Sequence, residues 1–117
     1  MSISWTHYKE KKILRLDYTG MDEEAMLKQL QGYHRILPAE REIRQLSDFG
    51  ETMISKTFVE TAKRLAAENP DGQAAKMALL GIHRHQRARV FTFNFQAKAN
   101  AQVFESEVEA LEWLASD

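Results

Sequence analysis

Polar side chains that could do chemistry gather in two short stretches of the sequence, each just after an expected strand. They supply carboxylate, hydroxyl, imidazole and guanidinium groups, at Asp48, Thr52, Ser55, Thr57, His83 and Arg84. In a parallel α/β sheet the carboxyl ends of the strands meet at one edge, where ligands commonly bind. We therefore expect these residues to form a binding surface where the two loops meet.

Two of these residues have alternative interpretations. A phosphorylated Ser55 at the start of a helix would meet free N–H groups and the positive end of the helix dipole. The simpler interpretation, which we favour, is that its hydroxyl caps the helix and contributes about 1 kcal/mol. Asp48 either pairs with a cation such as Arg84 or accepts N–H bonds within its own loop, as in an Asx turn.

Catalysis and metal binding have little support in the sequence. It contains no G-x-S-x-G, H-E-x-x-H, Walker or dinucleotide-binding motif. His83 and His85 form an H-x-H pair, but zinc needs a third and usually a fourth ligand. The chain has no Cys, and the other histidines belong to separate expected elements. We expect a non-enzyme without metal or cofactor; a small hydrolase using Asp48 and His83 is the weakest alternative.

The net charge of −1 conceals a partition along the chain. Residues 72–104 contain five bases and no acid, whereas residues 105–117 contain five acids and no base. Positive charge at the start of a helix is mildly unfavourable, so Arg84, Arg87 and Arg89 suggest an anionic partner such as a lipid headgroup, a phosphorylated ligand or a second copy. The simpler interpretation, which we favour, is that the acidic last helix lies near the preceding helix of the same chain.

The basic segment is too small to predict nucleic-acid binding. The isoelectric point of about 6.4 is also below the range typical of proteins that bind nucleic acids. We expect a protein partner, with a homodimer as one form, rather than DNA or RNA.

Three phenylalanines, Phe91, Phe93 and Phe95, lie in a segment whose spacing fits either a strand or a helix. We choose a helix because its start is rich in helix formers and because strands and helices alternate on both sides. One narrow helical stripe cannot bury all three rings, so we expect Phe93 to face elsewhere. With Arg87 it would mark a dimer, membrane-surface or apolar-ligand contact. The alternative is that the helix packs on two sides, or that the segment is a strand.

The elements that position these groups follow from apolar spacing and from turn residues. The expected strands are Ile3–Tyr8, Lys12–Tyr18, Ile43–Phe49, Met77–Ile82 and Ala101–Phe104. Expected helices begin after Asp22 and Ser55, near Arg84, and after Ser106, and the first two end at Pro38 and at Asn69–Pro70. The order β-β-α-β-α-β-α-β-α predicts one α/β domain, residues 1–117, with a largely parallel sheet.

Three stretches carry a family resemblance: Ile3-Ser4-Trp5, Leu46-Ser47-Asp48-Phe49, and the pattern F-x-x-x-x-E-A-L-x-W-L over residues 104–114. They resemble the SpoIIAA-like, or STAS-related, family of small bacterial proteins. The resemblance implies successive right-handed βα units and a regulatory role. Anti-sigma-factor antagonists of this kind carry a D-S-x-G-like phosphorylation switch after the third strand, which residues 48–57 do not reproduce.

The expected function is therefore a non-catalytic binding or regulatory module of SpoIIAA-like type that binds a protein or a small anion. Its alternative is a carrier of lipid or of a small apolar ligand under the Phe-rich helix. A large apolar pocket beneath that helix would favour the carrier, and a flat surface would favour a protein partner. The start of the chain resembles no export signal, and Met77–Ile82, the longest apolar run, is too short to span a bilayer, so we expect a soluble cytoplasmic protein.

Overall fold

Five strands form one mixed sheet whose spatial order follows the chain, β1-β2-β3-β4-β5. They are β1 (Ile3–Tyr8), β2 (Lys11–Asp17), β3 (Arg44–Asp48), β4 (Lys76–Leu80) and β5 (Ala101–Phe104). The first two strands pair antiparallel as a hairpin, and every later pair is parallel. The computed structural model describes residues 3–36, 43–68, 74–97 and 99–116. The expected α/β class and element order are confirmed.

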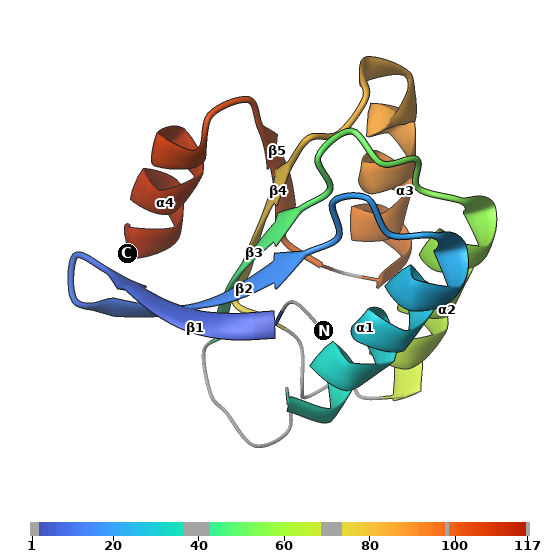
Figure 1. Ribbon diagram of the computed structural model, residues 1–117, viewed down its shortest axis with the longest axis horizontal. Coiled ribbons are helices and arrows are strands. Elements are labelled where there is room, and N and C mark those ends of the chain that lie inside the picture. The colour runs from blue at the N-terminus through green and yellow to red at the C-terminus, as the bar shows by residue number, and fades with distance from the viewer. Residues whose placement is uncertain (1–2, 37–42, 69–73, 98, 117) are drawn as a thin grey trace.

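Four helices cover the sheet unequally. They are α1 (Glu23–Ile36), α2 (Lys56–Glu68), α3 (Arg87–Ala97) and α4 (Glu107–Ala115), and one 3₁₀ turn, Arg84–Gln86, precedes α3. Because each new strand is added on the same side of the last, crossovers of one hand place their helices on one face. Figure 1 shows α1, α2 and α3 together on that face and α4 alone on the other.

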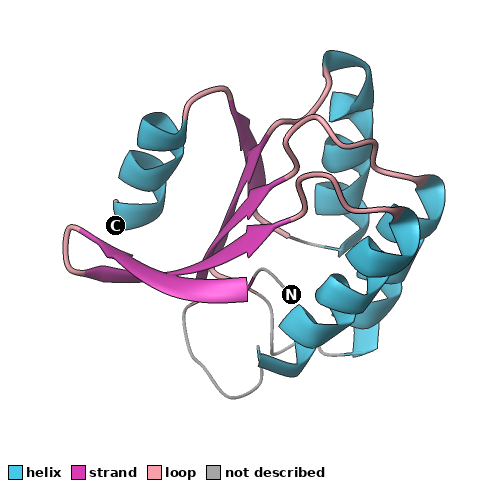
Figure 2. Ribbon diagram, in the orientation of Figure 1, coloured by secondary structure: helices cyan, strands magenta, loops and turns pink. Residues whose placement is uncertain are grey.

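Each face of the sheet has its own apolar core. On the three-helix face, Leu14 and Leu16 of β2 pack with Met26 and Leu30 of α1 and Phe58 of α2. On the α4 face, the second core is formed by Ile13, Leu46, Ala78, Leu80, Ala110 and Leu114. The continuous apolar run of β4 is explained by this arrangement, because both faces of the strand are covered. Figure 2 shows the same two layers of helix on either side of the strands.

Helix starts follow the expected capping residues. The side-chain oxygens of Asp22, Ser55 and Ser106 accept hydrogen bonds from the backbone N–H groups three residues later, at 2.8, 3.0 and 3.1 Å. These bonds satisfy N–H groups that the helices leave without internal partners. The expected helix ends at Pro38 and Asn69–Pro70 lie outside the described residues. The segment with three phenylalanines is a helix, as expected.

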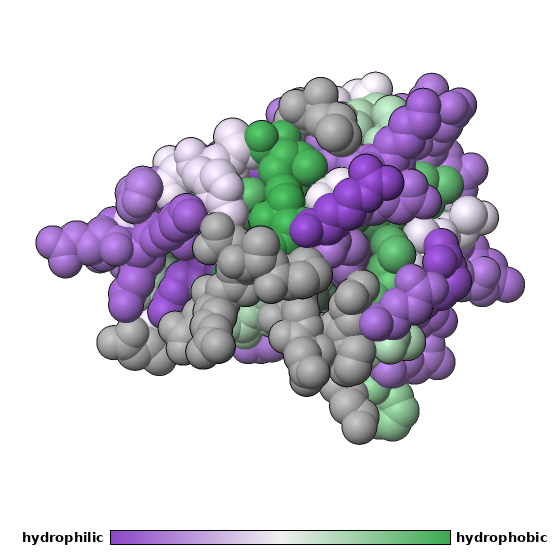
Figure 3. All heavy atoms as spheres, turned by 90° about the horizontal axis from the view of Figure 1, so that it is seen from below, coloured by the Kyte–Doolittle hydropathy of each residue, from purple (hydrophilic) through white to green (hydrophobic). Residues whose placement is uncertain are grey.

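One face of the molecule shows how hydrophilic and hydrophobic side chains are distributed on the surface. Seen from below, hydrophobic side chains form a short strip between hydrophilic regions (Figure 3). Within the described ranges, no helix combines the length and the apolar character that crossing a membrane requires.

Candidate functional site

The loops after β3 and β4 meet at the carboxyl edge of the sheet, as expected. The N–H of Phe49 donates to the carbonyl of Leu80, and the N–H of Glu51 donates to the carbonyl of Gly81, both at 2.9 Å. The side-chain amide of Gln86 links the two loops further. It accepts from the N–H of Ile54 at 3.2 Å and donates to the carbonyl of Ile54 at 2.8 Å. The two loops are therefore one connected structure.

Most of the polar residues predicted there hold the loops in shape. Asp48 Oδ1 accepts from the N–H of Gly50 at 3.0 Å, which is the Asx turn that was one of its two interpretations. Thr52 Oγ1 accepts from the N–H of Gly20 at 3.1 Å. His83 Nε2 lies 3.0 Å from the carbonyl oxygen of Glu51. Between the two described residues Asp48 and Arg84 there is no ion pair.

Ser55 is engaged from both sides. Its hydroxyl oxygen accepts from the N–H of Phe58, and its O–H donates to Glu23 Oε1 at 2.6 Å. A phosphate on Ser55 would therefore meet a carboxylate, which repels it. This geometry favours the capping interpretation over the phosphorylation site.

The remaining predicted polar residues do not converge. Thr57 and Arg84 are exposed, and the exposed Arg87 forms an ion pair with Glu105 at 3.4 Å. The rings of His83 and His85 lie 5.2 Å apart. Among the described residues, no three His, Cys, Asp or Glu side chains form a group that could hold a metal ion.

A cavity lies instead between the sheet and the three helices on its first face. Its walls come from α1, α2, α3, β3, β4, the start of β5 and the loop after β3. The empty volume is about 800 Å³ with the open mouth included, and the centre of a water molecule can reach about 100 Å³ of it. Roughly 10–15 Å³ by that second measure holds one water, so the cavity has room for a small organic molecule.

Short side chains create this space. Ala62 and Ala66 lie one turn apart on the inner face of α2, and Ala74 and Ala101 border the sheet side. Larger apolar residues at these positions would fill the gap between helix and sheet. At the loop end, the rings of Tyr18 and Phe49 stack at 4.8 Å, and Phe58 meets both edge-on. An aromatic cluster thus closes this end, and the wall as a whole is almost wholly apolar.

Three buried polar atoms in residues that line this cavity lack hydrogen-bond partners. They are the hydroxyl of Tyr33, Nδ1 of His34 and Oε1 of Gln45, and all three residues line the cavity. In the described part of the chain, no other buried side-chain nitrogen or oxygen is unpaired. Native proteins seldom leave such groups unsatisfied, since each costs about 1–3 kcal/mol.

Buried glutamine amides away from the cavity are hydrogen-bonded within the fold, unlike the unpaired end of the Gln45 amide. Gln29 donates to the carbonyl of Asp17 at 2.8 Å, and both ends of the Gln86 amide bond to Ile54. Only one end of the Gln45 amide is engaged, because its Nε2 donates to Ser47 Oγ. The fold therefore satisfies its buried amides except at the cavity.

Burial also sets the charge of this region. Burial raises the pKa of Tyr33 well above its usual value, so its hydroxyl keeps its proton. Burial lowers the pKa of His34, against a weaker opposite effect of Glu68. The edge of the Tyr33 ring packs on the His34 imidazole at 5.3 Å. The polar end of the cavity is therefore neutral.

The expectation that Phe93 of α3 faces away from the core is wrong. Phe93 faces the cavity and packs against the core, whereas Phe91 and Phe95 are 75% and 81% exposed. Phe91 and Phe95 share a face that points away from the sheet, one turn apart, and Phe93 falls between them on the opposite side. None of the 11 residues of α3 is fully buried. Helix α3 therefore covers the cavity without being deeply buried itself.

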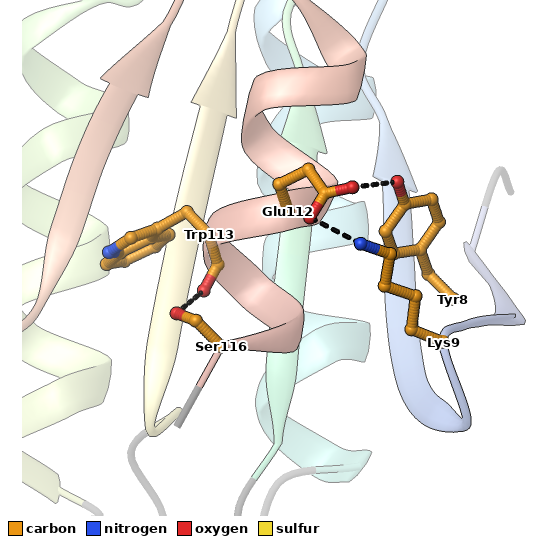
Figure 4. Close-up of polar contacts among 5 residues, drawn as sticks. All are labelled: Tyr8, Lys9, Glu112, Trp113 and Ser116. Atoms are coloured by element: carbon orange, nitrogen blue, oxygen red, sulfur yellow. Dashed lines mark hydrogen bonds and ion pairs between the residues drawn. The ribbon is translucent and has the colours of Figure 1, made fainter.

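The expectation that the acidic last helix lies near α3 is wrong. Helix α4 lies across the sheet from α3, against β3, β4 and β5. Its acids pair with the N-terminal hairpin: Glu107 with Arg15, and Glu112 with Lys9 at 2.8 Å. Figure 4 shows Glu112 between Lys9 and Tyr8, whose hydroxyl donates to Glu112 Oε1 at 2.6 Å. The acids of α4 are thus paired with cations of the N-terminal hairpin rather than of α3.

The polar residues of the cavity were missed by reasoning from sequence. A usable signal was present in Gln45 and Ser47, which stand two apart in a strand that other strands flank on both sides. Two polar residues on one face of such a strand must face the core. Tyr33 is buried on the inner face of α1, but no sequence pattern shows that its hydroxyl is unpaired.

Searches against protein-family models, curated proteins and solved structures find no match to this chain. The SpoIIAA-like assignment therefore stays a prediction from the sequence.

Proposed function

We propose that this protein is a non-catalytic binding module that holds a small, mainly apolar molecule in the cavity between its sheet and helices α1 to α3. The observation that carries the proposal is the cavity itself, which lies under the Phe-rich helix and has an almost wholly apolar wall. Apart from the open mouth, the centre of a water molecule can reach about 100 Å³ of it, which is room for one small organic molecule. Transfer of apolar surface into such a wall contributes roughly 25 cal/mol per Å².

The resemblance to the SpoIIAA-like family supports a regulatory form of the same proposal. In that form, the connected loops after β3 and β4 contact a protein partner in the cytoplasm. The exposed Thr57 and Arg84 lie beside those loops and are available for such a contact. The apolar cavity is the stronger of the two supports, because most of the polar groups at the loop edge are already bonded within the fold.

The test uses toluene as a probe and two neighbouring alanines of α2. Ala66 lines the cavity and is 5% exposed, whereas Ala67 is exposed. We expect ligand-observed NMR to detect toluene binding to the wild type and to Ala67→Phe, but not to Ala66→Phe, whose ring would occupy the cavity. Ala62→Leu provides a second, smaller filling variant if Ala66→Phe does not fold.

Equal binding of toluene to all folded variants would place its site elsewhere and contradict the proposal. Failure of the wild type to bind toluene or any other apolar probe of that size would contradict it as well. Native mass spectrometry of protein purified from cells is a complementary measurement, in which we expect a bound small molecule that Ala66→Phe loses.

A further inference from the structure

The three unpaired polar atoms belong to side chains that line the cavity. Tyr33 and Gln45 are each only 3% exposed, and both line the cavity with His34. Tyr33 comes from the last turn of α1 and Gln45 from β3, so helix and sheet each contribute a polar group. These atoms have lost water on folding without gaining a protein partner, so each keeps a hydrogen-bonding capacity that the fold leaves unused.

The atoms also define what kind of group would satisfy them. The Tyr33 hydroxyl both donates and accepts, and His34 Nδ1 does one or the other according to its tautomer. The Gln45 amide has one end on Ser47 and one end unpaired, and this holds whichever way the amide is turned. A hydroxyl or carbonyl oxygen can bond to such a mixed set of donors and acceptors.

A charged group does not suit this end of the cavity. Among the described residues of the lining the one arginine is Arg89, and it is exposed, so it lies on the solvent side rather than among the buried atoms. The same described lining contains no carboxylate. An ion placed beside Tyr33 and Gln45 would therefore be buried without a counter-ion, which costs several kcal/mol.

We propose that the cavity selects a neutral ligand with an apolar body and one hydroxyl or carbonyl group, and that Tyr33, His34 and Gln45 bind that group. This inference rests on the proposed function and adds the chemical class of the ligand. The apolar wall supplies affinity, and the three polar atoms supply orientation and selectivity.

The experiment compares three probes of the same shape: toluene, p-cresol and 4-methylbenzoate. In a purely apolar cavity p-cresol binds more weakly than toluene, because its hydroxyl loses water without gaining a partner. We expect isothermal titration calorimetry to show that p-cresol binds the wild type at least as tightly as toluene, and that 4-methylbenzoate binds most weakly.

Two isosteric variants assign the selectivity to the residues. We expect Tyr33→Phe and Gln45→Leu each to weaken p-cresol binding by about five- to tenfold and to leave toluene binding unchanged. Tyr8→Phe is the matched control, because it removes the same hydroxyl from a tyrosine that bonds to Glu112 outside the cavity. If one cavity variant fails to fold, the other still tests the assignment.

The outcomes separate this inference from the function on which it rests. If none of the three probes binds, the proposed function fails together with the inference. If toluene binds and p-cresol binds less tightly, or if both cavity variants leave p-cresol unchanged, the cavity is a ligand site without the proposed polar selectivity. Tightest binding of 4-methylbenzoate would overturn the inference in favour of an anionic ligand at Arg89.

Discussion

Gly81 lies so close to Gly50 that a Cβ atom on Gly81 would be 2.4 Å from the Gly50 backbone nitrogen. This contact joins the loops after β3 and β4, and both glycines have positive φ. The carboxyl edge of the sheet is therefore held together by backbone against backbone, with no room for a side chain between the loops.

Substitution of Gly81 tests this contact. We expect Gly81→Ala to lower the free energy of unfolding by more than about 2 kcal/mol, because it adds a clash with rigid backbone to the strain of a positive φ. Gly20→Ala is the control, since Gly20 has nearly the same φ, +73° against +72°, but open space around its Cβ position. Urea unfolding of both variants measures the difference, and equal losses would contradict a clash at Gly81.

The contact between α4 and the hairpin predicts a shifted carboxyl titration. Hydrogen bonds from Lys9 and Tyr8 lower the pKa of Glu112. We expect Lys9→Met to raise that pKa toward its ordinary value, as measured by ¹³C NMR of the side-chain carboxyl group. Because Glu112 has the lower pKa in the folded state, the contact stabilises above the ordinary carboxylate range and is lost as pH falls through the folded value. An unchanged Glu112 pKa in Lys9→Met would contradict the contact in solution.

The half-buried His34 predicts a second pH dependence. Burial lowers its pKa in the folded state, whereas in the unfolded chain it titrates near its ordinary value of about 6.5. Between those two values the unfolded state binds the proton more readily, so stability falls as pH decreases from about 6.5 through the folded pKa. We expect His34→Gln to reduce this fall in urea unfolding between about pH 7 and pH 5.

His7→Gln is the control for His34→Gln, because His7 is exposed on β1. A pH dependence that both histidine variants share with the wild type would exclude His34 as the source.

Because α3 is sparsely packed, we expect it to open more readily than the other helices of its face. With no fully buried residue, α3 should open more often than α1, which buries Met26, Gln29, Leu30 and Tyr33. We expect backbone amide hydrogen exchange to be faster in α3 than in α1, and a ligand in the cavity to slow exchange in α3 most. Exchange in α3 as slow as in α1 without ligand would contradict this prediction.

The fold was predictable because its signals are local and strong. Asp22, Ser55 and Ser106 mark helix starts through their own side-chain oxygens, and the apolar run of β4 reflects cover on both faces. Strand ends were less certain: β4 ends at Leu80, two residues before the expected Ile82, because the chain turns at Gly81 with φ of +72°.

The site was harder to predict because it is an empty space between helices and sheet rather than a set of residues with a recognisable spacing. Asp48 and His83 are the residue types that do chemistry, but their bonds to Gly50 and Glu51 use them to shape a loop. The cavity lies between α1, α2, α3 and the sheet and is bordered by short alanines of α2, and no local pattern encodes how these elements pack. Likewise, the acidic C-terminal segment predicts a charged contact, but only the tertiary fold decides that the acids of α4 pair with Lys9 and Arg15 and that Glu105 pairs with Arg87.

The solitary position of α4 has a consequence for synthesis on the ribosome. Ile13, Leu46 and Ala78 have no exposed surface in the finished fold, and α4 is the helix that covers their face. Because α4 follows all five strands in the sequence, the three-helix face can close around its own core while the opposite face is still open to water and to chaperones. We expect the second core to be completed after the first, because Ala110 and Leu114 are translated last.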